Sequence, residues 1–268
     1  MSGSVIHSQS AAMIPAVYSA GQPASLPVAI DYPAALALRQ MSMVHDELPK
    51  YLLAPEVSAL LHYVPDLRRK MLLATLWNTG ARINEALALT RGDFSLAPPY
   101  PFVQLATLKQ RTEKAARTAG RTPAGQQTYR LVPLSDSWYV SQLQTMVATL
   151  KIPMERRNKR TGRTEKARIW EVTDRTVRTW IGEAVAAAAA DGVTFSVPIT
   201  PHTFRHSYAM HMLYAGIPLK VLQSLMGHKS ISSTEVYTKV FALDVAARHR
   251  VQFAMPEVDA VAMLKGNI

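Results

Sequence analysis

Hydrophobic residues recur at helical spacing along most of the chain. After Ala54-Pro55, which suits a first helical turn, apolar residues follow three or four positions apart: Val57, Leu60, Leu61 and Val64. A second helix is predicted from about Asp66 to Asn78, with Gly80 where a helix C-terminus favours glycine. A third helix is predicted to begin near Arg82.

The same spacing, together with residues that cap helix ends, predicts further helices. A short one follows the capping residue Asp31, and others open at Ser135, Thr173 and Thr200-Pro201. The predicted ranges are 32–48, 135–150, 173–190, 200–216, 219–226, 233–240 and 243–251.

Two segments have the character of strands instead. Residues 102–108 and 128–134 are predicted to pair as a small antiparallel sheet, joined by a long polar and basic turn. The fold class that follows is mainly α with a small antiparallel β sheet. Residues 1–30 are rich in Ser, Ala and Pro without a period, which indicates a flexible segment. We therefore expect an arm over residues 1–50, flexible or partly helical, and an ordered unit over residues 51–250.

Positive charge is concentrated in the middle of the chain. The net charge is +11, and residues 101–250 carry 22 basic and 10 acidic side chains, whereas both ends are close to neutral. Such a surface suits a nucleic acid, although a basic protein without that partner fits equally. The densest run, residues 151–168, is predicted to be either a solvated loop or a segment that contacts DNA through its basic side chains: Arg156, Arg157, Lys159 and Arg160.

The absence of cysteine narrows the chemistry. It excludes disulfides, thiol catalysis and Cys-ligated zinc, and it agrees with a reducing bacterial cytoplasm. No Lys or Arg precedes Arg39, so the start lacks the character of a signal peptide, and no apolar stretch is long enough for a bilayer. We expect no membrane partner.

The helix after Pro201 carries the first candidate chemistry. His202 and Arg205 share a face near the helix N-terminus, where free N–H groups and the helix dipole favour a phosphate. His202 and His206 also have the spacing of two zinc ligands, but no HExxH pattern accompanies them. Ser207 lacks the G-x-S-x-G turn of a hydrolase nucleophile. We assign His206 and His211 to structure rather than to chemistry.

Three further residues each have an ordinary explanation when taken singly. His228 could cap a helix end, Tyr237 could be a packing residue, and Arg82 could form a salt bridge with Glu85. Their order along the chain, together with His202 and Arg205, has no such explanation. The blocks resemble the tyrosine recombinase (phage integrase) family, over about residues 52–249, in four places: Thr79-Gly80-Ala81-Arg82-Ile83-Asn84-Glu85, Pro201-His202-Thr203-Phe204-Arg205-His206, Leu225-Met226-Gly227-His228 and the segment around Tyr237. Arg130-Leu131-Val132-Pro133-Leu134 resembles the strand that closes the β hairpin of the family.

The resemblance implies the tyrosine recombinase catalytic domain fold over residues 51–250 and a role for each matched residue. Tyr237 would attack the scissile phosphate and form a 3′-phosphotyrosine bond. Arg82 and Arg205 would hold the non-bridging oxygens, and His202 and His228 would support phosphate contact and proton transfer.

The family also has a lysine on the hairpin that protonates the departing 5′-hydroxyl. Lys109 fits that position best, and Lys114 is the alternative. The resemblance implies no metal, no ATP and no other cofactor, because the phosphotyrosine conserves the bond energy.

The resemblance also predicts partners. They are double-stranded DNA with specific sites and three further copies of the chain in a tetramer. Residues 251–268 form a tail whose apolar face either docks on a neighbouring subunit or frays. About fifty residues precede the catalytic block, and they are not basic. We therefore do not expect the N-terminal DNA-binding domain that most family members have, and we expect accessory DNA-bending proteins as partners.

Within the family, the chain is most similar to plasmid-borne multimer resolvases, which predicts plasmid resolution. Inversion, integration, topoisomerase IB-like nicking and closing, and an inactive DNA-binding repressor stay open as alternatives.

Overall fold

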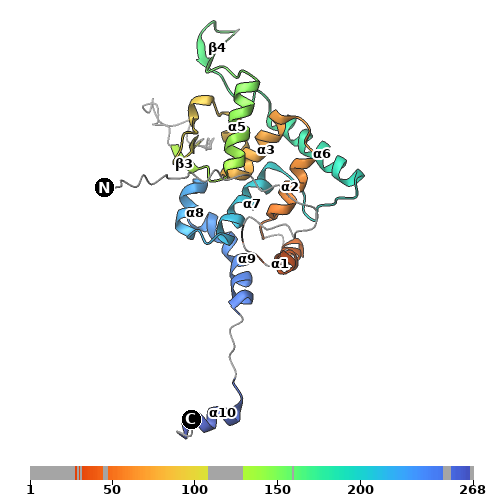
Figure 1. Ribbon diagram of the computed structural model, residues 1–268, viewed down its shortest axis with the longest axis vertical. Coiled ribbons are helices and arrows are strands. Elements are labelled where there is room, and N and C mark those ends of the chain that lie inside the picture. Colours follow the sequence, from red (N-terminus) through yellow and green to blue (C-terminus); the bar gives the residue numbers. More distant parts are fainter. Residues whose placement is uncertain are drawn as a thin grey trace, which may run out of the picture.

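The computed structural model describes residues 28, 30, 32–44, 48–107, 129–158, 160–249 and 255–265. Helices dominate these residues, and a three-stranded sheet lies at one side (Figure 1), so the predicted fold class is confirmed. The helices are α1 (Tyr32–Val44), α2 (Ala54–His62), α3 (Leu67–Thr79), α4 (Ile83–Leu87), α5 (Ser137–Thr149), α6 (Asp174–Ala190), α7 (Pro201–Tyr214), α8 (Leu219–Met226), α9 (Ser232–His249) and α10 (Glu257–Leu264), with a short 3-10 turn at Arg91–Asp93.

Polar side chains determine where several helices begin. The Asp66 carboxylate accepts the backbone N–H of Arg69 at 2.8 Å before α3. Thr173 and Thr200 do the same for α6 and α7, as the sequence predicts. Such a cap satisfies a backbone donor that has no partner inside the helix, and it contributes about 1 kcal/mol.

Helix α3 forms the centre of the core. It packs against α5 and against α7, and Leu72, Leu73 and Leu76 are completely buried between these neighbours. Because α3 is buried and is capped by Gly80, the position from which the next segment starts is fixed.

The sheet has the order β1-β2-β3 and is antiparallel throughout. Strand β1 (Phe94–Ser95) was not predicted, whereas β2 (Phe102–Ala106) and β3 (Tyr129–Pro133) match the expected pair. Val103 lies opposite Val132, and both are buried. In β3 the burial alternates, so Arg130 points to the same covered face as Val132. That face lies beside α8.

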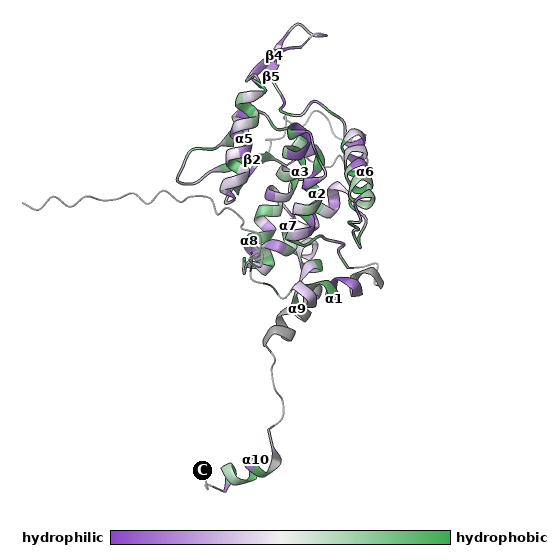
Figure 2. Ribbon diagram, turned by 45° about the vertical axis from the view of Figure 1, so that its right-hand side comes forward, coloured by the Kyte–Doolittle hydropathy of each residue, from purple (hydrophilic) through white to green (hydrophobic). Residues whose placement is uncertain are grey.

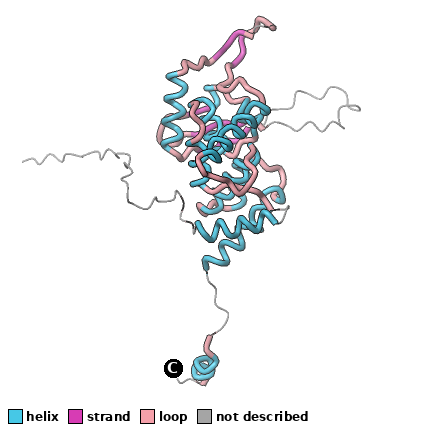
Figure 3. Tube along the Cα trace, turned by 90° about the vertical axis from the view of Figure 1, so that its right-hand side faces the viewer, coloured by secondary structure: helices cyan, strands magenta, loops and turns pink. Residues whose placement is uncertain are grey.

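The basic run is not the loop that the sequence suggests. It forms a two-stranded hairpin of β4 (Glu155–Arg157) and β5 (Thr164–Lys166) that projects beyond the helices (Figures 1 and 3) and is mostly hydrophilic (Figure 2). The turn closes because the Asn158 side chain accepts the backbone N–H groups of Arg160 and Thr161 and because Gly162 has a positive φ of 70°. Apolar periodicity gave no sign of this hairpin because its strands are too short and too polar.

A second prediction was wrong at α9. The sequence suggested two short helices, over 233–240 and 243–251, but residues 232–249 form one continuous helix. The residues between the two predicted helices, Phe241 and Ala242, are neither Gly nor Pro and give the backbone no reason to break.

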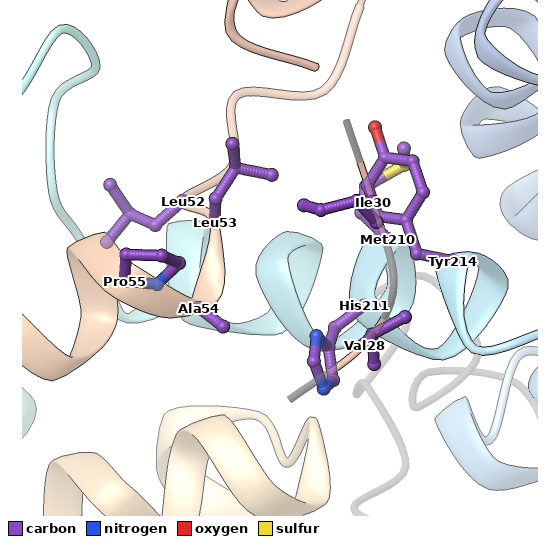
Figure 4. Close-up of a pocket in the computed structure, with 9 residues that line it drawn as sticks. All are labelled: Val28, Ile30, Leu52, Leu53, Ala54, Pro55, Met210, His211 and Tyr214. Atoms are coloured by element: carbon purple, nitrogen blue, oxygen red, sulfur yellow. The ribbon is translucent and has the colours of Figure 1, made fainter. Parts of the chain in front are cut away.

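The segment before the ordered unit is attached at two places. Arg39 of α1 is buried; it forms an ion pair with Glu56 of α2 and donates to the Ser196 hydroxyl at 2.6 Å. Val28 and Ile30 line a small apolar pocket with the start of α2 and the end of α7 (Figure 4). Part of the predicted arm is therefore packed on the ordered unit.

Helix α10 lies apart from the other helices (Figure 1) and is largely hydrophobic (Figure 2). Val258 is 79% exposed and Leu264 is 89% exposed. Among the described residues, no helix has the length and apolar character needed to cross a membrane.

Gly80 tests how tightly the end of α3 is specified. Its φ is +58°, and a Cβ added there would lie 2.4 Å from Cδ1 of Tyr208. We expect Gly80→Ala to lower the free energy of unfolding by about 1–3 kcal/mol, because the backbone is strained and the core is overpacked. Urea denaturation measures this change.

Gly182→Ala is the matched control. Gly182 lies inside α6 with nothing within 4 Å of an added Cβ, so alanine should stabilise the protein by about 1 kcal/mol. Equal effects of the two substitutions would contradict the role of Gly80.

Candidate active site

The Arg205 guanidinium lies where three segments of the chain meet. Arg205 is in α7 and is only 2% exposed. It donates to the carbonyl of Gly80 at the end of α3, and at 2.6 Å to the carbonyl of Met226 at the end of α8. Carbonyls at helix C-termini carry partial negative charge and favour a cation. These bonds bring the residues that follow each helix, Arg82 and His228, to the same region.

Arg82 presents a cation to the surface of this region. It is the last residue before α4, and its side chain is 37% exposed. Its guanidinium donates to a Glu85 carboxylate oxygen at 3.0 Å. The salt bridge to Glu85 that the sequence suggested is therefore present, and the exposed part of the guanidinium is accessible to an anion.

Glu85 connects this arginine to the sheet. Its carboxylate is completely buried and accepts two hydrogen bonds from Arg130 of β3, at 2.6 and 3.2 Å. Burial alone would raise the pKa of Glu85, but the hydrogen bonds and charge of Arg130, followed by those of Arg82, lower it below its ordinary value. Arg130 also donates to the carbonyl of Leu225 at 2.8 Å. It therefore holds α4 and the end of α8 in a fixed relation.

His228 is oriented by the turn that ends α8. Gly227 has a positive φ of 63° at this turn, and an added Cβ would lie 3.0 Å from Nη1 of Arg130. Nδ1 of His228 is 2.9 Å from the hydroxyl of Thr234. The opposite ring edge, with Nε2, is therefore left for other contacts. Burial, followed by the charges of Arg205 and other arginines, lowers the pKa of His228 to about 4.

Tyr237 lies beneath the same cluster. It is in α9 and is 2% exposed, and its hydroxyl is 2.9 Å from Nδ1 of His206. Burial raises the pKa of Tyr237 to about 12, while the nearby charges of Arg205 and Arg82 act in the opposite direction. His202 is exposed at the start of α7, and partial burial, Arg205 and Arg82 lower its pKa. The structure thus brings together five of the six catalytic residues predicted from the sequence.

Comparison with known proteins identifies the family. Residues 50–243 match the phage integrase family. The chain belongs to this family. It is a tyrosine recombinase. Over 265 residues, which are 99% of either chain, it is 97% identical to a resolvase of Escherichia coli (strain K12). It is 46% identical to a probable site-specific recombinase in the afa region of Escherichia coli, over 94% of this chain and 96% of that protein.

Solved structures agree on the fold. The XerH site-specific recombinase bound to a palindromic difH substrate has a TM-score of 0.54 at 19% identity, covering 76% of this chain and 53% of that one. The match covers about half the length of the XerH chain, and this likeness supports the fold alone.

Lys109 and Lys114, and Lys159 of the basic run, lie outside the described residues. The other predicted DNA contacts belong to the β4–β5 hairpin and its turn. Arg156 forms ion pairs with Glu165 and Glu171 on and beside the hairpin. Arg157 and Arg160 are exposed.

The structure adds residues of the cluster to which the sequence analysis gave no place in the chemistry. Arg130, Thr234 and His206 each touch a predicted site residue, or the carboxylate next to one, by a hydrogen bond. The sequence analysis noted Arg130 only as part of a strand. Its buried position in the alternation of β3 was the signal that could have marked it, because an arginine on a covered face needs a carboxylate partner.

Arg130 should stabilise the folded recombinase through its ion pair with Glu85. We expect Arg130→Met to lower the free energy of unfolding by about 3–5 kcal/mol at neutral pH, because it leaves a buried carboxylate with one partner. Glu85 has a lowered pKa in the folded protein, so its favourable contribution is present above its unfolded pKa and is lost as pH falls through the folded pKa. The gap between wild type and variant should therefore narrow on acidification.

Arg178→Met is the control, since Arg178 pairs with Asp174 on the exposed face of α6. It should cost less than about 1 kcal/mol. Chemical denaturation at several pH values measures both, and a gap that widens toward acid would contradict the assignment of Glu85.

Proposed function

We propose that this recombinase breaks and rejoins DNA at specific sites through a 3′-phosphotyrosine intermediate on Tyr237. One observation carries the proposal. The Tyr237 hydroxyl is 2.9 Å from Nδ1 of His206, which directly follows Arg205 on α7, so the phenol lies within the cluster of cations around Arg205. A phosphate held by this cluster would therefore lie close to the phenol.

The remaining residues supply what the transesterification needs. The exposed part of Arg82 would contact the non-bridging oxygens of the phosphate, with Arg205 adding positive charge from behind. His202 is exposed and His228 keeps one ring edge for other contacts, so both could contact the phosphate or move a proton. Preorganised donors of this kind each contribute on the order of 10²–10³ in rate. Lys109, or alternatively Lys114, stays the predicted donor to the departing 5′-hydroxyl.

The proposed partners are double-stranded DNA and further copies of the chain. The XerH structure is a complex with its DNA substrate, and this supports DNA as the partner here. The apolar side chains of α10, exposed in the isolated chain, support docking of residues 251–268 on a neighbouring subunit in a tetramer. Accessory DNA-bending proteins are part of the proposal because residues 1–50 carry two basic and three acidic side chains and so offer little positive charge to DNA.

The proposed biological role is resolution of plasmid multimers in the bacterial cytoplasm. The resolvase name of the 97% identical relative supports resolution. Inversion and integration use the same chemistry and differ in the arrangement of the two target sites.

The first experiment uses a supercoiled plasmid carrying two candidate sites from the replicon that bears the gene, without added metal. Wild-type protein should give covalent protein–DNA adducts and recombinant circles. Tyr237→Phe should give neither, while it binds DNA as tightly as wild type, because only the hydroxyl is lost. Gel assays of adducts, circles and binding measure the three quantities.

Each outcome has a separate meaning. Adducts that persist in Tyr237→Phe would rule out this nucleophile. Relaxation of plasmids that lack any site would favour topoisomerase-like activity, and binding without adducts in wild type would favour a repressor. In the same assay, Leu264→Asp should form adducts but few recombinants if α10 docks between subunits, and an unchanged yield of recombinants would contradict that docking.

The hairpin gives a second test. We propose that its exposed cations contact the DNA backbone, and we expect Arg157→Gln combined with Arg160→Gln to weaken binding to all sequences. The slope of log affinity against log salt is negative, and each lost phosphate contact should make it shallower by about 0.9. Binding measured over a range of salt concentrations checks this.

Arg156→Gln is the matched control on the same hairpin. Its charge is already paired with two carboxylates, so the slope should stay that of wild type. If the double variant also keeps the wild-type slope, the hairpin is a solvated projection that does not contact DNA.

A further inference from the structure

His206 has a direct contact with the proposed nucleophile. Its Nδ1 lies 2.9 Å from Oη of Tyr237, and the two rings meet edge to face with centroids 5.6 Å apart. Among the hydrogen bonds formed by the described residues, this is the one that reaches the Tyr237 hydroxyl. The contact joins residues 31 positions apart, one on α7 and one on α9.

Both groups are neutral in the free protein. Burial lowers the pKa of His206 to about 4. The electrostatic effects of His202, Arg205 and His228 act in the same direction. Tyr237 keeps its proton because its pKa is raised. In the neutral tautomer with its proton on Nε2, Nδ1 accepts the hydrogen bond that the phenol donates. A neutral imidazole with its lone pair on the nucleophile is the arrangement that a general base requires.

The other histidines of the cluster are placed differently. His202 stands one turn before His206, with its ring edge-on to that of His206 at 4.7 Å. Nδ1 of His228 is engaged by Thr234. Of the three imidazoles, His206 is the one hydrogen-bonded to the Tyr237 oxygen within the part of the chain that the structure describes.

His206 also borders an open cavity. The cavity has a volume of about 360 Å³ and is lined by His202 and Val236 as well. An imidazole that gains a proton on one nitrogen can release the other one to solvent, so a ring between a buried phenol and an open cavity can pass a proton outward.

We infer that His206 is a catalytic residue that accepts the phenolic proton of Tyr237 during DNA cleavage. As the bond from Oη to phosphorus forms, the O–H bond of Tyr237 breaks and its proton moves to Nδ1 of His206. The bond from phosphorus to the 5′-oxygen breaks, and that oxygen takes a proton from a separate general acid. In the rejoining step, His206 returns a proton to Oη as the tyrosine leaves. The inference rests on the proposed role of Tyr237.

His206→Asn separates proton transfer from positioning. The amide oxygen of asparagine can stand where Nδ1 stands and accept the same hydrogen bond, but it cannot take up a proton. The probe is the duplex that gives wild-type adducts in the plasmid experiment, prepared with a nick so that cleavage is trapped. We expect adduct formation at neutral pH to fall by about 10²-fold or more, with DNA affinity and the circular dichroism spectrum unchanged.

The pH profile provides a readout that a structural role would not change. In His206→Asn the proton must leave to hydroxide, so the rate of adduct formation should climb from neutral to mildly alkaline pH, whereas the wild-type rate stays level. His211→Asn is the matched control. His211 is on the same helix with a pKa also lowered by burial, but its ring packs on Trp77, so its variant should behave as wild type.

A sulfur atom in place of the 5′-leaving oxygen gives a second discrimination, because a thiolate leaves without protonation. The defect of His206→Asn should persist on this substrate. Restoration by sulfur would place His206 on the leaving-group side and overturn the inference. A wild-type rate in His206→Asn, or a slow rate that does not rise with pH, would overturn it as well.

Two provisions keep the result interpretable. If His206→Asn does not fold, His206→Gln is used in the same assays with the same expectations. If wild type gives no adduct, the proposed function fails and the inference about His206 falls with it, whereas wild-type adducts with an unimpaired His206→Asn overturn the inference alone.

Discussion

The candidate active site depends on one buried cation, the guanidinium of Arg205. It hydrogen-bonds to the backbone at the ends of α3 and α8, segments that are 125 and 21 residues away along the chain. A charge with 2% exposure is stable there because carbonyl dipoles face it and the Glu85 carboxylate lies near. Arg82 and His228 each follow one of the two carbonyl residues by two positions. Their placement is therefore a consequence of the Arg205 hydrogen bonds more than of their own contacts.

Around this centre, positive charge exceeds negative charge. Arg82, Arg130 and Arg205 surround one buried carboxylate, and the pKa of Arg205 is lowered to about 10 by burial and by the other two arginines. Burial first, and then the same excess of positive charge, lowers the pKa of His206 and of His228 to about 4 and so keeps both neutral at physiological pH. An anion such as a phosphate diester would relieve this repulsion on binding, so the affinity for the substrate and the protonation of the histidines are coupled.

Local sequence determined much of this architecture. Residues such as Thr173 and Thr200 and the glycine at position 80 marked helix ends where the structure has them, because each acts through hydrogen bonds or dihedral angles within a few residues. The ordered blocks around Arg82, Arg205, His228 and Tyr237 identified the cluster through family resemblance. Arg130, Thr234 and His206 were not assigned a role because their partners lie 45, 6 and 31 residues away, and side-chain direction at such separations depends on tertiary packing. The β4–β5 hairpin escaped notice because short polar strands have no apolar period.

The burial of Tyr237 has a consequence for how the enzyme samples DNA. Every phosphodiester along a genome is chemically the same, and a protein that slides by electrostatic attraction meets very many of them before it reaches its site. In the free protein Tyr237 is only 2% exposed and its hydroxyl is hydrogen-bonded to His206, so a phosphate that passes over the surface does not meet a free phenol. Under the proposed function, scanning and cutting would be separate events, and non-target DNA would be protected by the burial of one side chain.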